Sequence, residues 1–459
     1  MPHGGVALAC KRSPATLGYG LGLLLAPLAT LFAAPLAAEE ASLPDYADET
    51  LSGDWGGRRT DLYRRGIALE GLYRVDALRN TSGGLQRGGR PMTHLELRMA
   101  ADLDKLQGWA DTTAFVSLLA DYGSKVNAAK TGSLLGVSNI EAPVSTHRLF
   151  HAWVQKDFGD RQWSLLAGLY PIDSEFMVMD AAGVFMQPPY GALGDLALTR
   201  GPSIFNNSAI GLRLKWTAAD RAWYVQGAVL DGVPGNPSHP KGTHIALGHG
   251  DGIMSIAEFG YRPGEAGHVF EPTTPDVGMP VDPVTKAHEL AADSFGKYAV
   301  GVWGYSARAN DLIDTDAAGA PLRRRSRGWY ALAEQTLASG TAIGDISVFC
   351  RVSATDGAST AIRTTQTIGL RLKGPLPGLE HDVLGLAHIH AGLGEKFRQA
   401  QAAAAIAAAS SETAWELTYR HQHNRWLGIQ PVVQRFRHPG GDLAHPRASV
   451  VGLRLEIAL

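Results

Sequence analysis

The charged side chains that could take part in chemistry recur at every second position of short stretches, opposite apolar neighbours. In "IALEGLYRVDA", residues 67–77, the charged residues have one parity and most apolar residues have the other. This period of two is typical of a strand with one polar and one apolar face. Applied to every such stretch, it places the following residues on a polar face: Glu70, Arg74, Asp76, Glu96, Arg98, His151, Gln155, Arg213, Lys215, Gln226, Glu258, Glu334, Arg351, Arg371, Glu416, Arg420 and Arg454.

This polar face carries both signs of charge, which suits the passage of a solute better than a reaction. Mixed carboxylates and guanidinium groups can replace the water around a polyhydroxylated solute without forming a ring of one charge. Trp153, between His151 and Gln155, and Trp303 share the face. Because an aromatic ring packs on the C–H face of a sugar, we predict His151, Trp153 and an arginine as the leading sugar contacts. The alternative role of Trp153 is to fill space beneath a loop.

Catalytic and metal sites have weaker support in the spacing. Glu258 and Glu334 could form the carboxylate pair of a glycoside hydrolase, although acids are ordinary on a wet polar face. The His-x-His pairs at 388–390 and 421–423 lack a third ligand. The sequence contains no nucleophile elbow, phosphate-binding loop or paired-cysteine metal motif. We therefore predict no enzyme activity, no cofactor and no metal.

The first 38 residues have the features of a secretory signal peptide, with a basic start, an apolar middle and small residues before the expected cleavage after Ala38. Two of the 42 basic residues lie in this leader, so 40 basic residues remain against 44 acidic ones. Nucleic-acid binding would need a clustered basic face, and the sequence gives no sign of one. The "ALAC" ending at Cys10 resembles a lipoprotein box but precedes the apolar region. Cys350, left alone after cleavage, is expected to be a small apolar packing residue.

The elements that position the polar face are predicted to be strands. Sixteen alternating segments begin near Ile67, Thr93, Asp111, Thr146, Gln162, Ser208, Ala222, Ile253, Phe295, Arg327, Gly344, Thr364, Asp382, Glu412, Trp426 and Arg447. After the leader no apolar run is long enough for a transmembrane helix. An even number of alternating strands in an exported chain favours a membrane-spanning antiparallel β-barrel.

The connections between these segments alternate in length, as they do in barrels with short periplasmic turns and long outer loops. Short turns at 158–161 and 218–221 are interleaved with long connections such as 171–207. The 171–207 connection could fold inward and narrow the channel, with the charged residues Asp173, Glu175 and Arg200. The proline-containing stretch 263–295 is long where a short turn is due, so we interpret it as a periplasmic insertion, or else as a miscounted strand pair.

The segment 39–66 is predicted to be periplasmic and to end in a short helix. Ser52 and Asp54 can accept hydrogen bonds from the free N–H groups of its first turn, and Gly66 can end it in the left-handed conformation. The alternation that begins at Ile67 then starts the barrel, which is expected to occupy 67–459.

Seven stretches in order resemble the carbohydrate-selective porins of the Gram-negative outer membrane, the OprB family. They are "SGDWGGRRTDLYRRGI", "NTSGGLQRGG", "YPIDSEF", "WYVQGAVLDGVPG", "SIAEFGYR", "GLRLKGPLPGLEHD" and "ETAWELTYRHQHNRWLGIQPVVQRFRHPGG". The resemblance implies a 16-stranded barrel with a narrow eyelet that admits monosaccharides, preceded by a short periplasmic helix. It also implies recognition by the barrel-assembly machinery of a terminal aromatic residue, whose place is taken here by Leu459.

The sequence therefore predicts an all-β outer-membrane porin for small neutral sugars of the glucose type, in contact with outer-membrane lipid. The alternative is a secreted or surface β protein that binds or hydrolyses carbohydrate without forming a channel. The predicted pore-lining residues are Arg74, Asp76, Glu96, Arg98, His151, Trp153, Gln155, Asp173, Glu175, Arg213, Glu258, Trp303, Arg351 and Arg371.

Overall fold

The computed structural model describes residues 43–123, 125–247, 250–263 and 296–459. The expected signal peptide at 1–38 and nearly all of the expected insertion at 263–295 lie outside the described residues.

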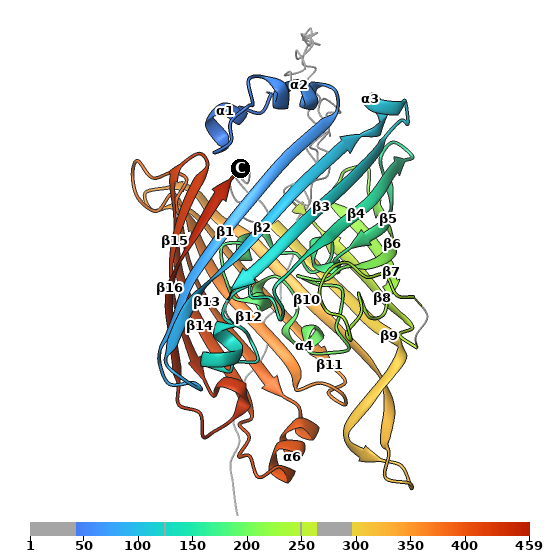
Figure 1. Ribbon diagram of the computed structural model, residues 1–459, viewed down its shortest axis with the longest axis vertical. Helices are drawn as coiled ribbons and strands as arrows, with labels where there is room; N and C mark the ends of the chain where they lie inside the picture. Colours follow the sequence, from blue (N-terminus) through green and yellow to red (C-terminus); the bar gives the residue numbers. More distant parts are fainter. Residues whose placement is uncertain (1–42, 124, 248–249, 264–295) are drawn as a thin grey trace, which may run out of the picture. The chain divides into compact units, whose positions relative to one another are not determined.

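Sixteen antiparallel strands form a closed barrel in which each strand pairs with its neighbours in sequence and β1 pairs with β16 (Figure 1). The strands are β1 (Ile67–Ser82), β2 (Gly88–Asp102), β3 (Thr112–Gly123), β4 (Thr146–Phe158), β5 (Trp163–Tyr170), β6 (Ala209–Thr217), β7 (Trp223–Asp231), β8 (Ile253–Tyr261), β9 (Gly296–Thr315), β10 (Pro321–Thr341), β11 (Gly344–Thr355), β12 (Ile362–Lys373), β13 (Val383–Leu393), β14 (Ser411–Asn424), β15 (Leu427–Arg437) and β16 (Ala448–Ala458). Closure satisfies the backbone of every strand without leaving a sheet edge.

The predicted number and order of strands are confirmed, and most predicted starts lie within two residues of the observed ones. Two starts are wrong by more, because β2 begins at Gly88 instead of Thr93 and β10 at Pro321 instead of Arg327. Both early portions are polar or glycine-rich, and ladder hydrogen bonds extend the strand there without an apolar alternation.

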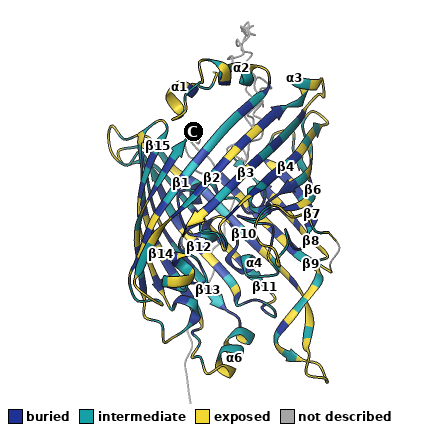
Figure 2. Cartoon of the chain, viewed as in Figure 1, coloured by how far each residue is buried: buried dark blue, intermediate teal, exposed yellow. Residues whose placement is uncertain are grey.

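The two faces of the barrel wall alternate along each strand (Figure 2). In β8, Met254, Ile256 and Glu258 are buried toward the interior, whereas Ile253 and Phe259 are 49% and 45% exposed on the outside. Outward apolar side chains recur around the wall, and hydrocarbon is the environment in which such a band is stable. Cys350 lies exposed on this outward face, so its expected role as an interior packing residue is wrong.

One end of the barrel, which we call the helix end, carries short turns, the C-terminus and the helices α1 (Tyr46–Glu49), α2 (Arg58–Arg64) and α3 (Leu103–Gln107) (Figure 1). Helix α2 begins later than predicted, and the Asp54 carboxylate accepts from Thr60 N at 2.8 Å. The chain leaves the helix through Gly66, whose φ of +96° favours glycine.

Arg59 of α2 links the start and the end of the barrel. Arg59 is 2% exposed, and its guanidinium group donates to the main-chain oxygens of Leu69 at 2.9 Å and Leu459 at 3.0 Å. It also lies 4.1 Å from the centre of the Tyr46 ring, within the range of a cation–π interaction. The helix is thereby fixed against the β1–β16 seam.

The opposite end, which we call the loop end, carries the long connections, helix α6 (Glu395–Ala403) and a hairpin formed by the extended β9 and β10 (Figure 1). Two of these connections, 125–145 and 171–207, fold into the barrel; the second includes α4 (Gly194–Ala197). No helix in the described parts of the chain combines the length and apolar character needed to cross a membrane.

Candidate solute pathway

The 171–207 loop fills much of the barrel interior with apolar side chains. Ile172, Phe176, Met177, Phe185 and Met186 are all 0–2% exposed. The 125–145 loop packs beside it, since Asn139 N donates to Met186 O at 2.6 Å and Gln187 Nε2 to Gly136 O at 3.2 Å. The two loops therefore occupy the barrel interior together, beside the polar wall.

Arg351 of β11 holds the 171–207 loop through main-chain carbonyl groups. Its guanidinium group donates to Met177 O at 2.8 Å, Gly191 O at 2.9 Å and Ala192 O at 3.0 Å, and also to Pro189 O. The residue is 2% exposed. A group predicted to touch solute thus anchors the 171–207 loop.

Three carboxylates of the wall anchor the same loop through its N–H groups. Glu258 of β8 accepts from Met177 N at 2.8 Å and from the hydroxyls of Tyr224 and Tyr330. Glu334 of β10 accepts from Ala181 N at 2.8 Å. Glu416 of β14 accepts from Met186 N at 2.6 Å and Gln187 N at 3.0 Å. The two acids considered for glycoside hydrolysis, Glu258 and Glu334, therefore both bind loop amides.

Arg74 and Asp76 of β1 lie at the seam with β16, in two ion pairs. Arg454 makes a bidentate contact with Asp76 at 2.7 and 2.8 Å. Glu456 accepts from Arg74 at 2.7 Å and from Arg420 of β14 at 2.9 Å. Asp76 also accepts from Ser138 Oγ at 2.6 Å, which attaches the 125–145 loop to this side of the wall.

Glu96, Arg98 and His151 come together on β2 to β4. Glu96 and Arg98 form an ion pair at 2.7 Å, and His151 Nδ1 lies 3.9 Å from Glu96 Oε1 and 2.8 Å from Ser117 Oγ. Sequence reasoning missed two neighbours, His94 and Asp121, whose side chains lie 2.7 Å apart. Both have the inward parity of their strands, so the same alternation could have identified them.

Gln155, Glu175 and Arg213 form a second polar group, on β4, β6 and the 171–207 loop. Arg213 lies 3.0 Å from the Glu175 carboxylate and donates to Gln155 Oε1 at 2.7 Å. Asp173, two residues before Glu175, accepts from Phe205 N at 3.3 Å. Desolvation inside the barrel raises the pKa of Asp173 to about 6.

The two predicted aromatic contacts are buried in the wall. Trp153 is 6% exposed and stacks on Phe115, with ring centroids 5.2 Å apart. Trp303 is 4% exposed and contacts Tyr305 edge to face. Arg371 of β12 is 2% exposed and faces the same interior. These three residues are not part of the polar groups formed by Glu96 or Arg213.

Metal ligation finds no support in this arrangement. In the residues that the structure covers, no three His, Cys, Asp or Glu side chains are grouped to hold a metal ion. The wall instead presents cations and anions that lie in ion pairs at 2.7–3.0 Å. Such a surface can exchange hydrogen bonds with a polar solute.

Known proteins resemble this chain along most of its length. It is 25% identical over 480 residues to "Porin B" of Pseudomonas aeruginosa, covering 97% of this chain and 98% of that protein. It is 23% identical over 437 residues to "Putative porin QuiX" of Acinetobacter baylyi, covering 89% and 92% of the two chains. Among solved structures, the high-pH structure of Pseudomonas putida OprB has a TM-score of 0.75 and 20% identity, covering 90% of this chain and 99% of that one.

These findings agree with the barrel described above and with an outer-membrane location. A family model described as "Carbohydrate-selective porin, OprB family" matches residues 86–459, which include fifteen of the sixteen strands. The chain belongs to the carbohydrate-selective porin family, OprB.

Proposed function

We propose that the barrel conducts small neutral sugars of the size of glucose by passive diffusion. The observation that carries this proposal is the pairing of the lumen charges. Arg74 with Glu456, Asp76 with Arg454, Glu96 with Arg98, and Glu175 with Arg213 each lie 2.7–3.0 Å apart. An ion that approaches one member of such a pair is repelled by the other member. A sugar hydroxyl group, in contrast, can donate a hydrogen bond to the carboxylate and accept one from the guanidinium group.

The proposed solute contacts are the two polar groups of the β2–β6 wall. Glu96, Arg98 and His151 form one group, and Gln155, Glu175 and Arg213 form the other. Arg74 and Asp76 line the neighbouring seam, since β1 pairs with β2. The remaining proposed lining residues are Trp153, Asp173, Trp303 of β9 and Arg371 of β12. Glu258 and Arg351 act indirectly, by holding the 171–207 loop at the position that sets the width of the passage.

Two partners of the barrel itself complete the proposal. The outward apolar residues, such as Leu118 at 51% and Val302 at 59% exposure, are suited to outer-membrane lipid. Strand β16, which ends next to Leu459, is the segment that the barrel-assembly machinery is proposed to recognise.

Liposome swelling tests the proposed channel. Purified, folded protein is expected to accelerate the swelling of liposomes in glucose, to do so more weakly in a disaccharide, and to have no effect in a dextran too large to enter. Folded protein that binds glucose without accelerating swelling would favour the alternative of a sugar-binding β protein that forms no channel.

A further inference from the structure

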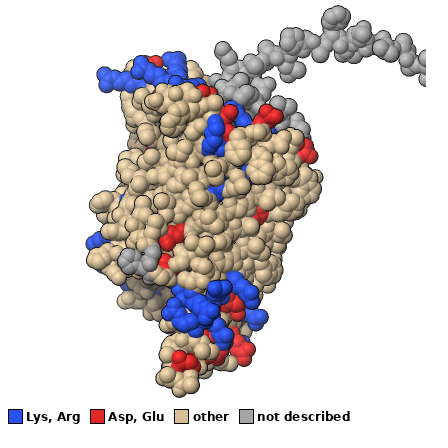
Figure 3. Space-filling model, turned by 90° about the vertical axis from the view of Figure 1, so that its right-hand side faces the viewer, with Lys and Arg blue, Asp and Glu red and all other residues tan. Residues whose placement is uncertain are grey.

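The hairpin of β9 and β10 carries a row of arginines on the outward face of the barrel. On that face, Val302 pairs with Trp329, and both are exposed in the apolar band, at 59% and 48%. The next outward pair toward the loop end is Gly304 with Arg327, and the one after it is Arg308 with Arg325. Figure 3 shows cationic side chains gathered near the lower end of the molecule, with some acidic ones beside them, below a broad belt that carries few charges.

The outward arginines lack acidic partners, although acids lie close by. On the inner face of the same hairpin, Arg324 and Lys396 of α6 both pair with Asp311 and Asp314 at distances up to 3.1 Å. Within the described residues, none of Arg308, Arg325 and Arg327 makes an ion pair. The local carboxylates therefore neutralise only the inner face.

Arg308 and Arg325 lie directly opposite each other in the ladder. Like charges in this position repel, so the arrangement is unfavourable unless an anion from outside the chain lies between them. Arg323 adds to the positive charge, because it donates to the Arg308 carbonyl oxygen at 2.6 Å and has no acidic partner among the described residues.

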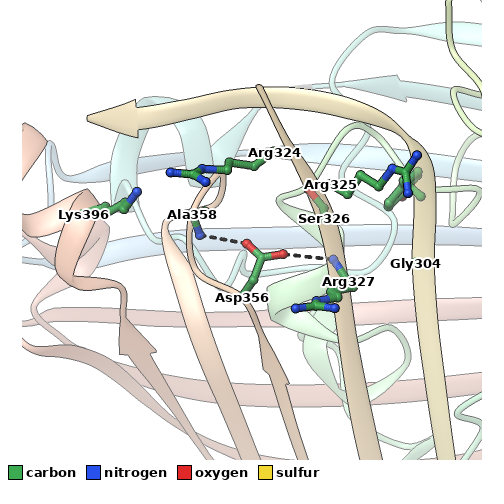
Figure 4. Close-up of a pocket in the computed structure, with 9 residues that line it drawn as sticks. Gly304, Arg324, Arg325, Ser326, Arg327, Asp356, Ala358 and Lys396 are labelled. Atoms are coloured by element: carbon green, nitrogen blue, oxygen red, sulfur yellow. Dashed lines mark hydrogen bonds between the residues drawn. The ribbon is translucent and has the colours of Figure 1, made fainter. Parts of the chain in front are cut away.

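Space for an anionic group lies beside the row. A cavity of about 590 Å³ is lined by Arg325 and Arg327 of the row but not by Arg308. Its other lining residues include Gly304 and Asp356 and, from the inner face, Tyr305, Arg324, Ser326 and Lys396. In Figure 4, Arg324, Arg325 and Arg327 follow one another along β10, and Asp356 faces the backbone of Arg327. The Asp356 carboxylate accepts from Arg327 N at 3.0 Å and Ala358 N at 2.9 Å, so main-chain donors occupy it.

We propose that Arg308, Arg325 and Arg327 bind the phosphate groups of a phosphorylated glycolipid anchored in the outer leaflet. The occupant is a lipid because the row continues the lipid-facing surface of β9 and β10, one residue pair beyond Trp329 and Val302. Arginine suits this task because its guanidinium group binds phosphate oxygens in bidentate fashion. The proposal rests on the outer-membrane location of the barrel and on the expectation, from the connection lengths, that the loop end faces the cell exterior. It does not require sugar transport.

The test compares lipopolysaccharide binding by detergent-solubilised wild-type protein and the triple variant R308Q/R325Q/R327Q, measured by native mass spectrometry. We expect the triple variant to bind at least tenfold more weakly and the corresponding triple lysine variant to retain part of the affinity. The matched control R58Q/R64Q/R65Q removes three exposed charges at the helix end and should bind as the wild type does. Equal binding by the wild type and the R308Q/R325Q/R327Q variant would overturn the proposal.

Two further measurements distinguish a lipid-bound phosphate from a free one, and an electrostatic contact from an apolar one. Glucose 6-phosphate should not displace the bound lipopolysaccharide; displacement at similar concentrations would show a site for free phosphorylated solutes and overturn the proposal. The binding of lipopolysaccharide to the wild-type protein should weaken as NaCl is raised from about 50 to about 500 mM. Binding that does not depend on salt would contradict an electrostatic contact and so the proposal. Liposomes that contain R308Q/R325Q/R327Q should swell in glucose at the wild-type rate, which verifies that the variant is folded. If the wild-type protein itself does not accelerate swelling, the result contradicts the proposed channel and not the proposed lipid site.

Discussion

At the residue scale, the same kind of inward arginine serves different purposes in this barrel. Arg351 is surrounded by loop carbonyl oxygens, whereas Arg98 lies beside Glu96 and near His151. Alternation placed both on the interior face, but their roles depend on where the 171–207 loop lies. That loop is held by contacts far apart in sequence, which no local pattern contains.

Arg351→Gln should loosen the 171–207 loop. Because several carbonyl groups lose a cationic donor, we expect the free energy of unfolding to fall by about 3 kcal/mol and the single-channel conductance to rise. Arg435→Gln, on the exposed outward face of β15, is the matched control and should change neither quantity. An unchanged conductance in folded Arg351→Gln protein would show that Arg351 does not set the width of the passage.

Arg98→Gln tests the first polar group. The change removes the partner of Glu96, so we expect the half-saturation concentration for glucose to change by about fivefold, equivalent to about 1 kcal/mol. Thermal stability should change less than for Arg351→Gln. The measurement is concentration-dependent block of ion current by glucose, with the exposed Arg437→Gln as control; equal half-saturation values would remove Arg98 from the solute pathway.

Asp173 should make the charge of the lumen depend on pH. The pKa of Asp173, about 6, lies above the ordinary value of an aspartate. Between about pH 4 and 6 the folded protein therefore holds a proton on Asp173 that the unfolded chain releases. The contribution of Asp173 to the free energy of unfolding falls as pH rises through that range. As pH rises from about 5 to about 7.5, the new negative charge should shift reversal potentials toward cation selectivity. The shift should be smaller in Asp173→Asn, and an equal shift in both proteins would assign it to other groups.

At the element scale, the β1–β16 seam combines a long ladder with buried charges. It runs from the pair Leu72 and Ala458 to the pair Ser82 and Ser449, and it carries the Asp76–Arg454 contact on its inner side. Breaking one partner of a buried ion pair is costly because the remaining charge stays desolvated.

Asp76→Asn should therefore lower the free energy of unfolding by about 3 kcal/mol. The double variant Asp76→Leu/Arg454→Met should recover part of this loss, because no unpaired charge remains. The temperature at which the folded gel band converts to the unfolded one provides the measurement, with Thr81→Ala at the exposed end of the seam as control. A double variant less stable than Asp76→Asn would show that the pair stabilises the seam beyond its charge balance.

Strand number and face were predictable because one face of every strand is constrained by lipid and the other by polar groups. The strand boundaries at the loop end were less predictable. The first residues of β10, including Arg323 to Arg325, lie beyond the apolar band, where hydrogen bonding alone defines the strand. The ion pair of Glu175 with Arg213 could not be predicted from the alternation either, because it depends on the path of a loop that leaves β5 and returns to β6.

At the scale of the whole molecule, the paired charges predict a channel that distinguishes solutes by charge. Glucose should enter liposomes faster than glucuronate and faster than glucosamine, because each charged sugar loses hydration that a paired lumen restores only in part. Swelling rates at equal osmolarity measure this, and reversal potentials in a KCl gradient should lie near zero. A strong preference for one ion would contradict the proposed neutral-sugar selectivity.

The contact between Arg59 and the main-chain oxygen of Leu459 joins residues that lie 400 positions apart in the chain. The acceptor reaches Arg59 only when β16 has docked on β1 in the correct register, because a slip of one residue moves the end of the strand by about 3.3 Å and reverses its faces. The contact that holds helix α2 in place can thus form only on a barrel whose β1–β16 seam has closed in the correct register, so the docking of the helix reports that closure is complete.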